Sequence, residues 1–156
     1  MVDEKKINLL YVEDDEADVD FVQTALRQTN CRGFSIHVVA DGEEALKFFG
    51  RDEKFKHMPM PQIVLLDLNL PKIGGKELLR RLKATENLKR IPVVILSTSS
   101  VERDVNEAYA LGASGYVTKP DNFDGYKEVM KQMHDYWTEV CELPLEGTKP
   151  FEMPGN

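Results

Sequence analysis

Ile63-Val64-Leu65-Leu66 is an uninterrupted apolar run that is followed at once by Asp67. Such a run is typical of a strand buried on both faces, as in a parallel sheet covered by helices. Pro71 and the pair Gly74-Gly75 then end regular structure. Ligands of open α/β sheets bind outside the carboxyl ends of the strands, so Asp67 occupies a position typical of a functional site.

Apolar runs and helical periodicity extend this pattern to both sides. Further strands are predicted at residues 7–12, 35–39, 93–96 and 116–118. Helices are predicted from the acidic residues 13–15 to residue 30, then at 41–50, 75–85, from Ser99 or Ser100 to 111, and at 123–140. Residues 51–61 lack apolar periodicity, which indicates a surface loop. Five strands alternating with five helices predict an α/β fold of the flavodoxin-like, doubly wound (βα)5 type, with strand order 2-1-3-4-5.

Composition indicates an ordinary globular protein. The 156 residues suit one domain, expected over residues 1–143, with a Pro- and Gly-rich tail at 144–156 expected to be poorly ordered. The net charge of −7 argues against nucleic acid or an anionic membrane as partner. No signal peptide or membrane-spanning run is present, and Cys31 and Cys141 are isolated, which predicts free thiols and a cytoplasmic location.

Polar side chains follow four of the predicted strands: Glu13, Asp14 and Asp15 the first, Asp67 the third, Ser97 and Thr98 the fourth, and Lys119 the fifth. Strands one, three and four are neighbours in the predicted order, so their ends face one crevice. Two carboxylates about 4 Å apart repel by about 4 kcal/mol at an effective dielectric constant of 20. A divalent cation such as Mg²⁺ removes that penalty. With a lysine and a hydroxyl nearby, the pattern predicts a site that handles a phosphoryl group.

Taken together, four motifs resemble the receiver domain of two-component response regulators over residues 7–140. They are Glu13-Asp14, Asp67-Leu-Asn-Leu-Pro71, Ser97-Thr98 and Gly115-Tyr116-Val-Thr-Lys119-Pro120. The loop at 51–61 and the segment at 136–144 resemble, more narrowly, the single-domain cyanobacterial phytochrome-type response regulators.

The resemblance implies a role for each matching residue. Asp67 would be the phosphoacceptor, and Lys119 would pair with the phosphoryl oxygens, aimed by a cis bond to Pro120. The hydroxyl of Ser97 would bind a phosphoryl oxygen, and Tyr116 would change rotamer with it, which couples the site to the fourth helix and fifth strand. Each of the last two has a structural alternative, helix capping for Ser97 and core packing for Tyr116.

The resemblance also implies Mg²⁺ as cofactor, held by Glu13, Asp14, Asp67 and the backbone carbonyl of Asn69. The expected partners are a sensor histidine kinase, phytochrome-like in the narrower resemblance, or a phosphotransfer protein, docked at the first helix. A downstream protein target is also expected, because no output domain follows the last helix. A homodimer is expected from that helix, whose apolar stripe could instead belong wholly to the core.

Two other functions compete with this hypothesis. A receiver-like scaffold that works without phosphorylation is one. A Mg²⁺-dependent aspartyl phosphatase is the other, but the second acid that such enzymes often carry two residues after the nucleophile is replaced here by Asn69. The protein is therefore expected not to be an enzyme, apart from its own phosphorylation from a phosphodonor and its own dephosphorylation.

Overall fold

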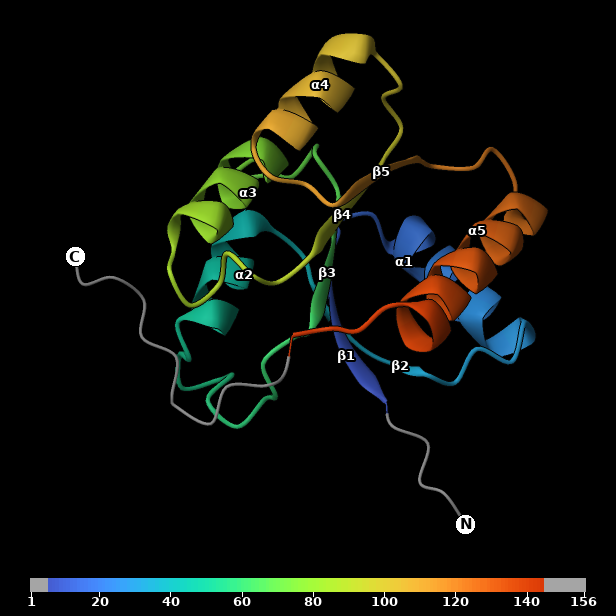
Figure 1. The fold of residues 1–156 in the computed structure, drawn as a ribbon, viewed down its shortest axis with the longest axis horizontal. Helices are drawn as coiled ribbons and strands as arrows, with labels where there is room; N and C mark the ends of the chain where they lie inside the picture. The colour runs from blue at the N-terminus through green and yellow to red at the C-terminus, as the bar shows by residue number, and fades with distance from the viewer. Residues whose placement is uncertain (1–5, 145–156) are drawn as a thin grey trace.

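Five parallel strands form a sheet in the order β2-β1-β3-β4-β5 in the computed structural model, which describes residues 6–144 (Figure 1). The strands are β1 (Ile7–Val12), β2 (Phe34–Val39), β3 (Ile63–Leu66), β4 (Val93–Ser97) and β5 (Gly115–Thr118). The predicted fold class and strand order are confirmed. Every residue of β3 and β4 is buried, because helices cover both faces of the sheet, whereas β5 lies at an edge and is partly exposed.

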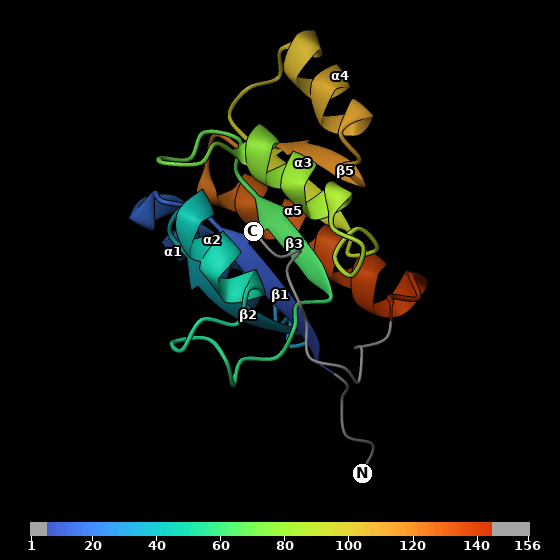
Figure 2. The ribbon, with the colours of Figure 1, turned by 90° about the vertical axis from the view of Figure 1, so that its left-hand side faces the viewer.

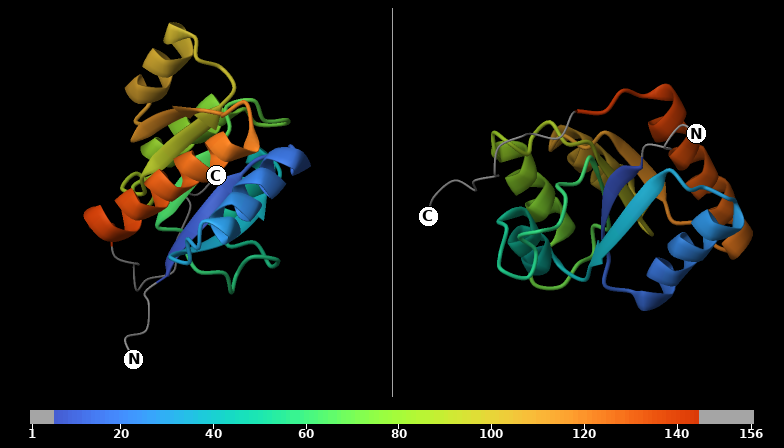
Figure 3. Two further views of the ribbon diagram at one scale, coloured as in Figure 1. Left: turned by 90° about the vertical axis from the view of Figure 1, so that its right-hand side faces the viewer. Right: turned by 90° about the horizontal axis from the view of Figure 1, so that it is seen from below.

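The helices divide between the two faces of the sheet (Figures 2 and 3). On one face lie α1 (Glu16–Gln28) and α5 (Phe123–Asp135); on the other lie α2 (Gly42–Phe49), α3 (Gly75–Ala84) and α4 (Glu102–Ala110). Each face has its own apolar core, one containing Val22 and Met130, the other Phe49 and Leu78. Helix α4 buries Ala108 alone, so it is the least anchored of the five. A membrane-spanning helix needs about 20 mostly apolar residues, and none of the helices within residues 6–144 meets that requirement.

Two helix ends differ from the sequence-based expectation. Helix α4 begins at Glu102 with no side-chain cap, because the Ser99 hydroxyl donates to Asp104 at 2.6 Å. Helix α5 ends at Asp135 and continues as a π-helical turn, η1 (Tyr136–Val140). Acidic side chains cap the N-termini of α1 and α2: Asp15 accepts hydrogen bonds from two backbone amides, and Asp41 accepts one.

The apolar stripe of the last helix belongs mainly to the core. Met130 and Met133 are buried, and Val129 and Trp137 pack against the same cluster. The exposed apolar side chains of this segment are instead in the π-helical turn, where Tyr136 and Val140 are 51% and 71% exposed. The tail predicted to be poorly ordered lies, beyond Pro144, outside the described residues.

The loop at 51–61 is partly buried, although its sequence indicated a surface loop. Phe55 is 3% exposed and lies with its ring centroid 5.3 Å from that of Phe48. The imidazole of His37, on β2, stacks on Phe48 at 5.3 Å and meets Phe55 edge-on at 5.9 Å. An aromatic cluster therefore ties this loop to the sheet, which the lack of apolar periodicity in the loop could not indicate.

This cluster predicts a pH dependence of stability. Burial lowers the pKa of His37, so the unfolded chain binds a proton there more readily than the folded chain does. The contribution of neutral His37 to the free energy of unfolding is fully present above the pKa of the unfolded chain, about 6.5, and is lost as the pH falls through the pKa of the folded chain. Replacing His37 with Gln should therefore flatten the fall in the free energy of unfolding between pH 7.5 and 5.5, measured by urea titration. An unchanged slope would contradict this.

Candidate functional site

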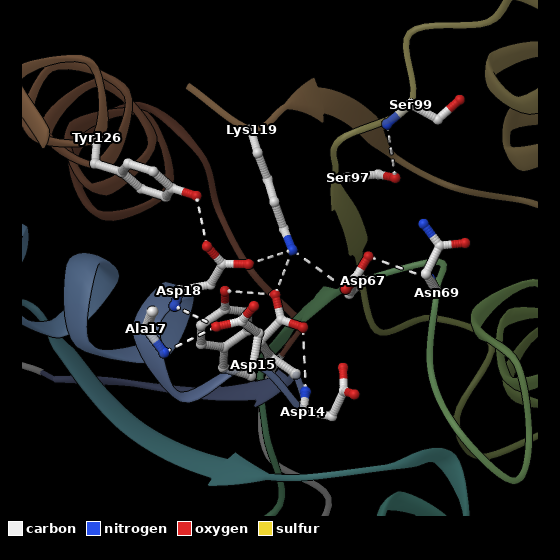
Figure 4. Close-up of polar contacts among 12 residues, drawn as sticks. Asp14, Asp15, Ala17, Asp18, Asp67, Asn69, Ser97, Ser99, Lys119 and Tyr126 are labelled. Carbon is white, nitrogen blue, oxygen red and sulfur yellow. Dashed lines mark hydrogen bonds and ion pairs between the residues drawn. The ribbon is translucent and has the colours of Figure 1, made fainter. Parts of the chain in front are cut away.

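Asp67 lies at the carboxyl end of β3, at the centre of a polar cluster (Figure 4). Its amide donates to the carbonyl of Val12, which aligns the ends of β1 and β3. The residue is 4% exposed. Its Oδ1 accepts from the amide of Asn69 at 3.2 Å, and its Oδ2 accepts from Lys119 at 3.2 Å. One oxygen of the Asp67 carboxylate is thus bound by the backbone that follows β3, and the other is bound by the ammonium of Lys119.

Glu13, at the end of β1, is a buried carboxylate beside Asp67. Its Oε1 accepts from Lys119 at 2.6 Å and from the hydroxyl of Tyr11 at 3.4 Å, and its Oε2 accepts from the amide of Asp14 at 3.1 Å. Burial, together with the neighbouring Asp67, raises the pKa of Glu13 to about 8, although Lys119 acts in the opposite direction. The lysine alone therefore does not compensate the negative charge gathered here.

Lys119 follows β5 and reaches the same cluster. Its amide donates to the carbonyl of Ser97, which sets the side chain over the ends of the central strands. Burial would lower the pKa of Lys119, but ion pairs with carboxylates, that of Asp18 foremost, raise it overall. The expected cis bond to Pro120 is absent, since the described chain contains no cis peptide bond. The lysine is therefore aimed by its carboxylate partners and by its backbone hydrogen bond.

Asp18, in the first turn of α1, belongs to the cluster and was not predicted as a site residue. Its Oδ2 accepts from Lys119 at 2.7 Å, and its Oδ1 accepts from the hydroxyl of Tyr126, on α5, at 3.3 Å. In the sequence it is one of several acids at a helix start, where acids are common. Only the packing of α1 against α5 and the position of Lys119 single it out.

The carboxylates of Glu13, Asp14 and Asp67 could hold a divalent cation. One oxygen from each lies within 4.8 Å of the others, and Asp14 is exposed while its two neighbours are buried. Hard oxygen donors with an open side match Mg²⁺ or Mn²⁺. The ammonium of Lys119 is bound by three carboxylates, those of Glu13, Asp18 and Asp67, and Asp14 adds a fourth beside Glu13 and Asp67. The group therefore has negative charge enough for a second cation. The amide of Asn69 places that residue at the rim of the same group.

Ser97 and Tyr116 converge on one residue of the loop between β4 and α4. The buried hydroxyl of Ser97 accepts from the amide of Ser99 at 3.3 Å, and the hydroxyl of Tyr116 donates to the carbonyl of Ser99 at 2.8 Å. The hydroxyl of Ser99 binds Asp104 on α4, which pairs with Lys76 on α3 at 2.7 Å. A chain of hydrogen bonds therefore connects the end of β4 to α4 and α3.

A second group of metal-ligating side chains lies at the far end of α5 and is already occupied by protein contacts. It consists of Cys31, His134 and Asp135. The Nε2 atom of His134 accepts from the amide of Gly33 at 2.9 Å, and Asp135 pairs with Lys131 at 2.8 Å. These contacts join α5 to the turn before β2, which is a structural role.

Comparisons with known proteins place these observations in context. The family model for the response regulator receiver domain matches residues 9–131. The response regulator Rcp1 of Synechocystis sp. (strain ATCC 27184 / PCC 6803 / Kazusa) is 38% identical over 136 residues, which are 87% of this chain and 92% of Rcp1.

Solved structures give the same result. The crystal structure of the phosphorylated cyanobacterial phytochrome response regulator RcpA matches with a TM-score of 0.83 and 35% identity, covering 90% of this chain and 99% of RcpA. The Mn²⁺-bound form of Rcp1 matches with a TM-score of 0.81 and 36% identity, covering 89% of this chain and 99% of Rcp1.

Proposed function

Because this chain belongs to the response regulator receiver family, we propose that it accepts a phosphoryl group on Asp67 from the phosphohistidine of a sensor histidine kinase or a phosphotransfer protein. One observation carries the proposal: the buried carboxylate of Asp67 lies 3.2 Å from the ammonium of Lys119 and beside the oxygens of Glu13 and Asp14. A nucleophile, a cation for the phosphoryl oxygens and a set of metal ligands therefore meet at one point.

The transfer would be a displacement at phosphorus. An oxygen of Asp67 forms the new O–P bond as the N–P bond of the donor histidine breaks, and the electron pair of that bond returns to the imidazole. The ammonium of Lys119 compensates the charge on the phosphoryl oxygens during transfer. Burial of Asp67 and Lys119 strengthens this electrostatic contribution, because the surroundings screen it less than water does.

Mg²⁺ would be the cofactor, held by Glu13, Asp14, Asp67 and the backbone carbonyl of Asn69. The crowding of carboxylates described above supports this assignment, and Rcp1 has been crystallised with Mn²⁺. When bound, the ion supplies positive charge that neutralises the oxygens of the incoming phosphoryl group.

Phosphorylation would change the surface of the protein through the hydrogen bonds centred on Ser99. Turning the Ser97 hydroxyl toward a phosphoryl oxygen costs its bond from the Ser99 amide, and Tyr116, bonded to the carbonyl of Ser99, would respond. Helix α4 buries one residue and exposes Tyr109 (51%), so a small change in free energy can alter this face. We propose that α4 and β5 present this change to a downstream protein.

Membership of the receiver family supports a role as a regulator rather than as a metabolic enzyme. The similarity to RcpA and Rcp1 supports a phytochrome-like kinase as the phosphodonor, docked on α1. A homodimer through the exposed Tyr136 and Val140 is part of the proposal. A phosphorylation-independent scaffold is the alternative that the following experiment addresses.

The proposal is tested by intact-mass analysis after incubation with acetyl phosphate, with Mg²⁺, with EDTA and with Asp67→Asn. We expect one phosphoryl group per chain in the presence of Mg²⁺, with acetate as the leaving group, and none with EDTA or in the variant. The exposed Asp52→Asn is the matched control and should be labelled like the wild type. A folded wild type that takes no label with Mg²⁺ would contradict phosphoryl acceptance and favour the scaffold.

A further inference from the structure

Lys119 is held more closely by Asp18 than by the phosphoacceptor. Its ammonium lies 2.7 Å from Asp18 and 2.6 Å from Glu13, but 3.2 Å from Asp67 (Figure 4). The side chain of Lys119 is 7% exposed, so these carboxylates rather than water determine where its ammonium lies. The position of the lysine therefore depends on α1 as well as on the ends of the strands.

Asp18 differs from the other two partners in what it can bind. Glu13 and Asp67 belong, with Asp14, to the group of oxygens that could hold a divalent cation, and Asp18 lies outside that group. A cation at the site would share the oxygens of Glu13 and Asp67 with the lysine. The carboxylate of Asp18 would stay available to Lys119 when the site is loaded.

The carboxylate of Asp18 is itself fixed on its other side. Its second oxygen accepts from the hydroxyl of Tyr126 at 3.3 Å, and its amide donates to the cap residue Asp15 at 3.2 Å. Tyr126 is 3% exposed and belongs to the core between α1 and α5. Asp18 is therefore held by packed elements, as a residue that orients another side chain must be.

We propose that Asp18 is a positioning residue for the phosphoryl transfer, acting through Lys119. It holds the lysine by one N–H, so that the other two, which meet Glu13 and Asp67 in the structure, stay directed to the phosphoacceptor and to the incoming phosphoryl oxygens. The inference rests on the proposed function of Asp67. The competing explanation is purely structural, in which Asp18 serves only the start of α1 and its contact with Tyr126.

A double-mutant cycle distinguishes the two explanations. The proteins are the wild type, Asp18→Asn, Lys119→Met and the double variant, with Asp20→Asn as a matched control at an exposed position of the same helix. The measured quantities are the initial rate of phosphorylation by acetyl phosphate at saturating Mg²⁺ and the Mg²⁺ affinity by calorimetry. Thermal unfolding checks each fold, and Asp18→Ser replaces the Asn variant if that one does not unfold cooperatively.

We expect Asp18→Asn to slow phosphorylation about tenfold, because misplacing a catalytic group by about 1 Å can cost up to 100-fold. The Mg²⁺ affinity should change by less than about threefold, since Asp18 is outside the ligand group, and Asp20→Asn should match the wild type. In the Lys119→Met background the Asn substitution should have no further effect on the rate, because residues that act as one unit are not additive.

A readout independent of phosphorylation comes from NMR of the metal-free protein. The ammonium ¹H–¹⁵N signal of Lys119, identified by its loss in Lys119→Met, should be sharp in the wild type and broadened in Asp18→Asn. An unchanged or faster rate in Asp18→Asn, or the same fall in rate with Lys119 absent, would overturn the positioning role and leave the phosphoacceptor intact. A wild type that is never labelled would overturn both.

Discussion

Replacing Lys119 with methionine is expected to strengthen Mg²⁺ binding and to slow phosphorylation of Asp67 at the same time. The lysine shares Glu13 and Asp67 with the proposed cation, so the two positive charges compete. Two charges about 4 Å apart repel by about 4 kcal/mol at an effective dielectric constant of 20, so a gain of tenfold or more in affinity is expected after relaxation. Phosphorylation should slow by about 100-fold, the usual cost of losing one donor to a developing oxyanion.

The two effects are measured separately. Calorimetry gives the Mg²⁺ affinity, and initial rates with acetyl phosphate at saturating Mg²⁺ give the transfer. Lys89→Met is the matched control, because Lys89 is half-exposed and pairs with Glu86 away from the site. A Lys119→Met protein that binds Mg²⁺ more weakly than the wild type would mean that the lysine does not compete with the cation.

The second large effect is on stability and comes from Gly75. A methyl group there would lie 2.3 Å from the carbonyl oxygen of Asp67 and 2.6 Å from the Cα of Leu68. Both are backbone atoms, so the start of α3 or the loop carrying Asp67 must shift. We expect Gly75→Ala to lower the free energy of unfolding by about 3 kcal/mol, as severe overpacking does. Urea denaturation measures the change, and labelling at Asp67 should fall with it.

Its neighbour Gly74 provides the control. No atom lies within 4 Å of a methyl group placed at Gly74, which caps α3 without a side-chain hydrogen bond. Gly74→Ser should therefore leave stability unchanged to within about 0.5 kcal/mol, with a small gain if the hydroxyl caps the helix. Equal losses at both positions would contradict the proposed close approach at Gly75.

Much of the fold could be predicted because its signals are local. The apolar run at β3 and the alternation of strands and helices specified a doubly wound sheet, and Asp15 and Asp41 indicated helix starts. The start of α4 was missed because Ser99 uses its hydroxyl for Asp104 instead of a cap. The burial of Phe55 was missed because it depends on partners far away in the sequence.

Some residues of the candidate site could likewise be predicted from local sequence signals, and others could not. Glu13, Asp67 and Lys119 each come directly after a strand, and parallel strands end at one edge, so their meeting followed from topology. Asp18 comes from a helix, and its direction depends on how α1 packs against α5. The convergence of Ser97 and Tyr116 on Ser99 required the path of a loop, which apolar periodicity does not predict.

The identity of the phosphorylated residue shows whether Asp67 is the phosphoacceptor. Borohydride reduces a phosphorylated aspartate to homoserine but leaves a free carboxylate unchanged. After incubation with acetyl phosphate and Mg²⁺, reduction and proteolysis, peptide mass spectrometry should find homoserine at position 67. Finding it at Asp14 or Asp18 instead, or finding none in a protein that carries the label, would contradict the assignment of Asp67 as the phosphoacceptor.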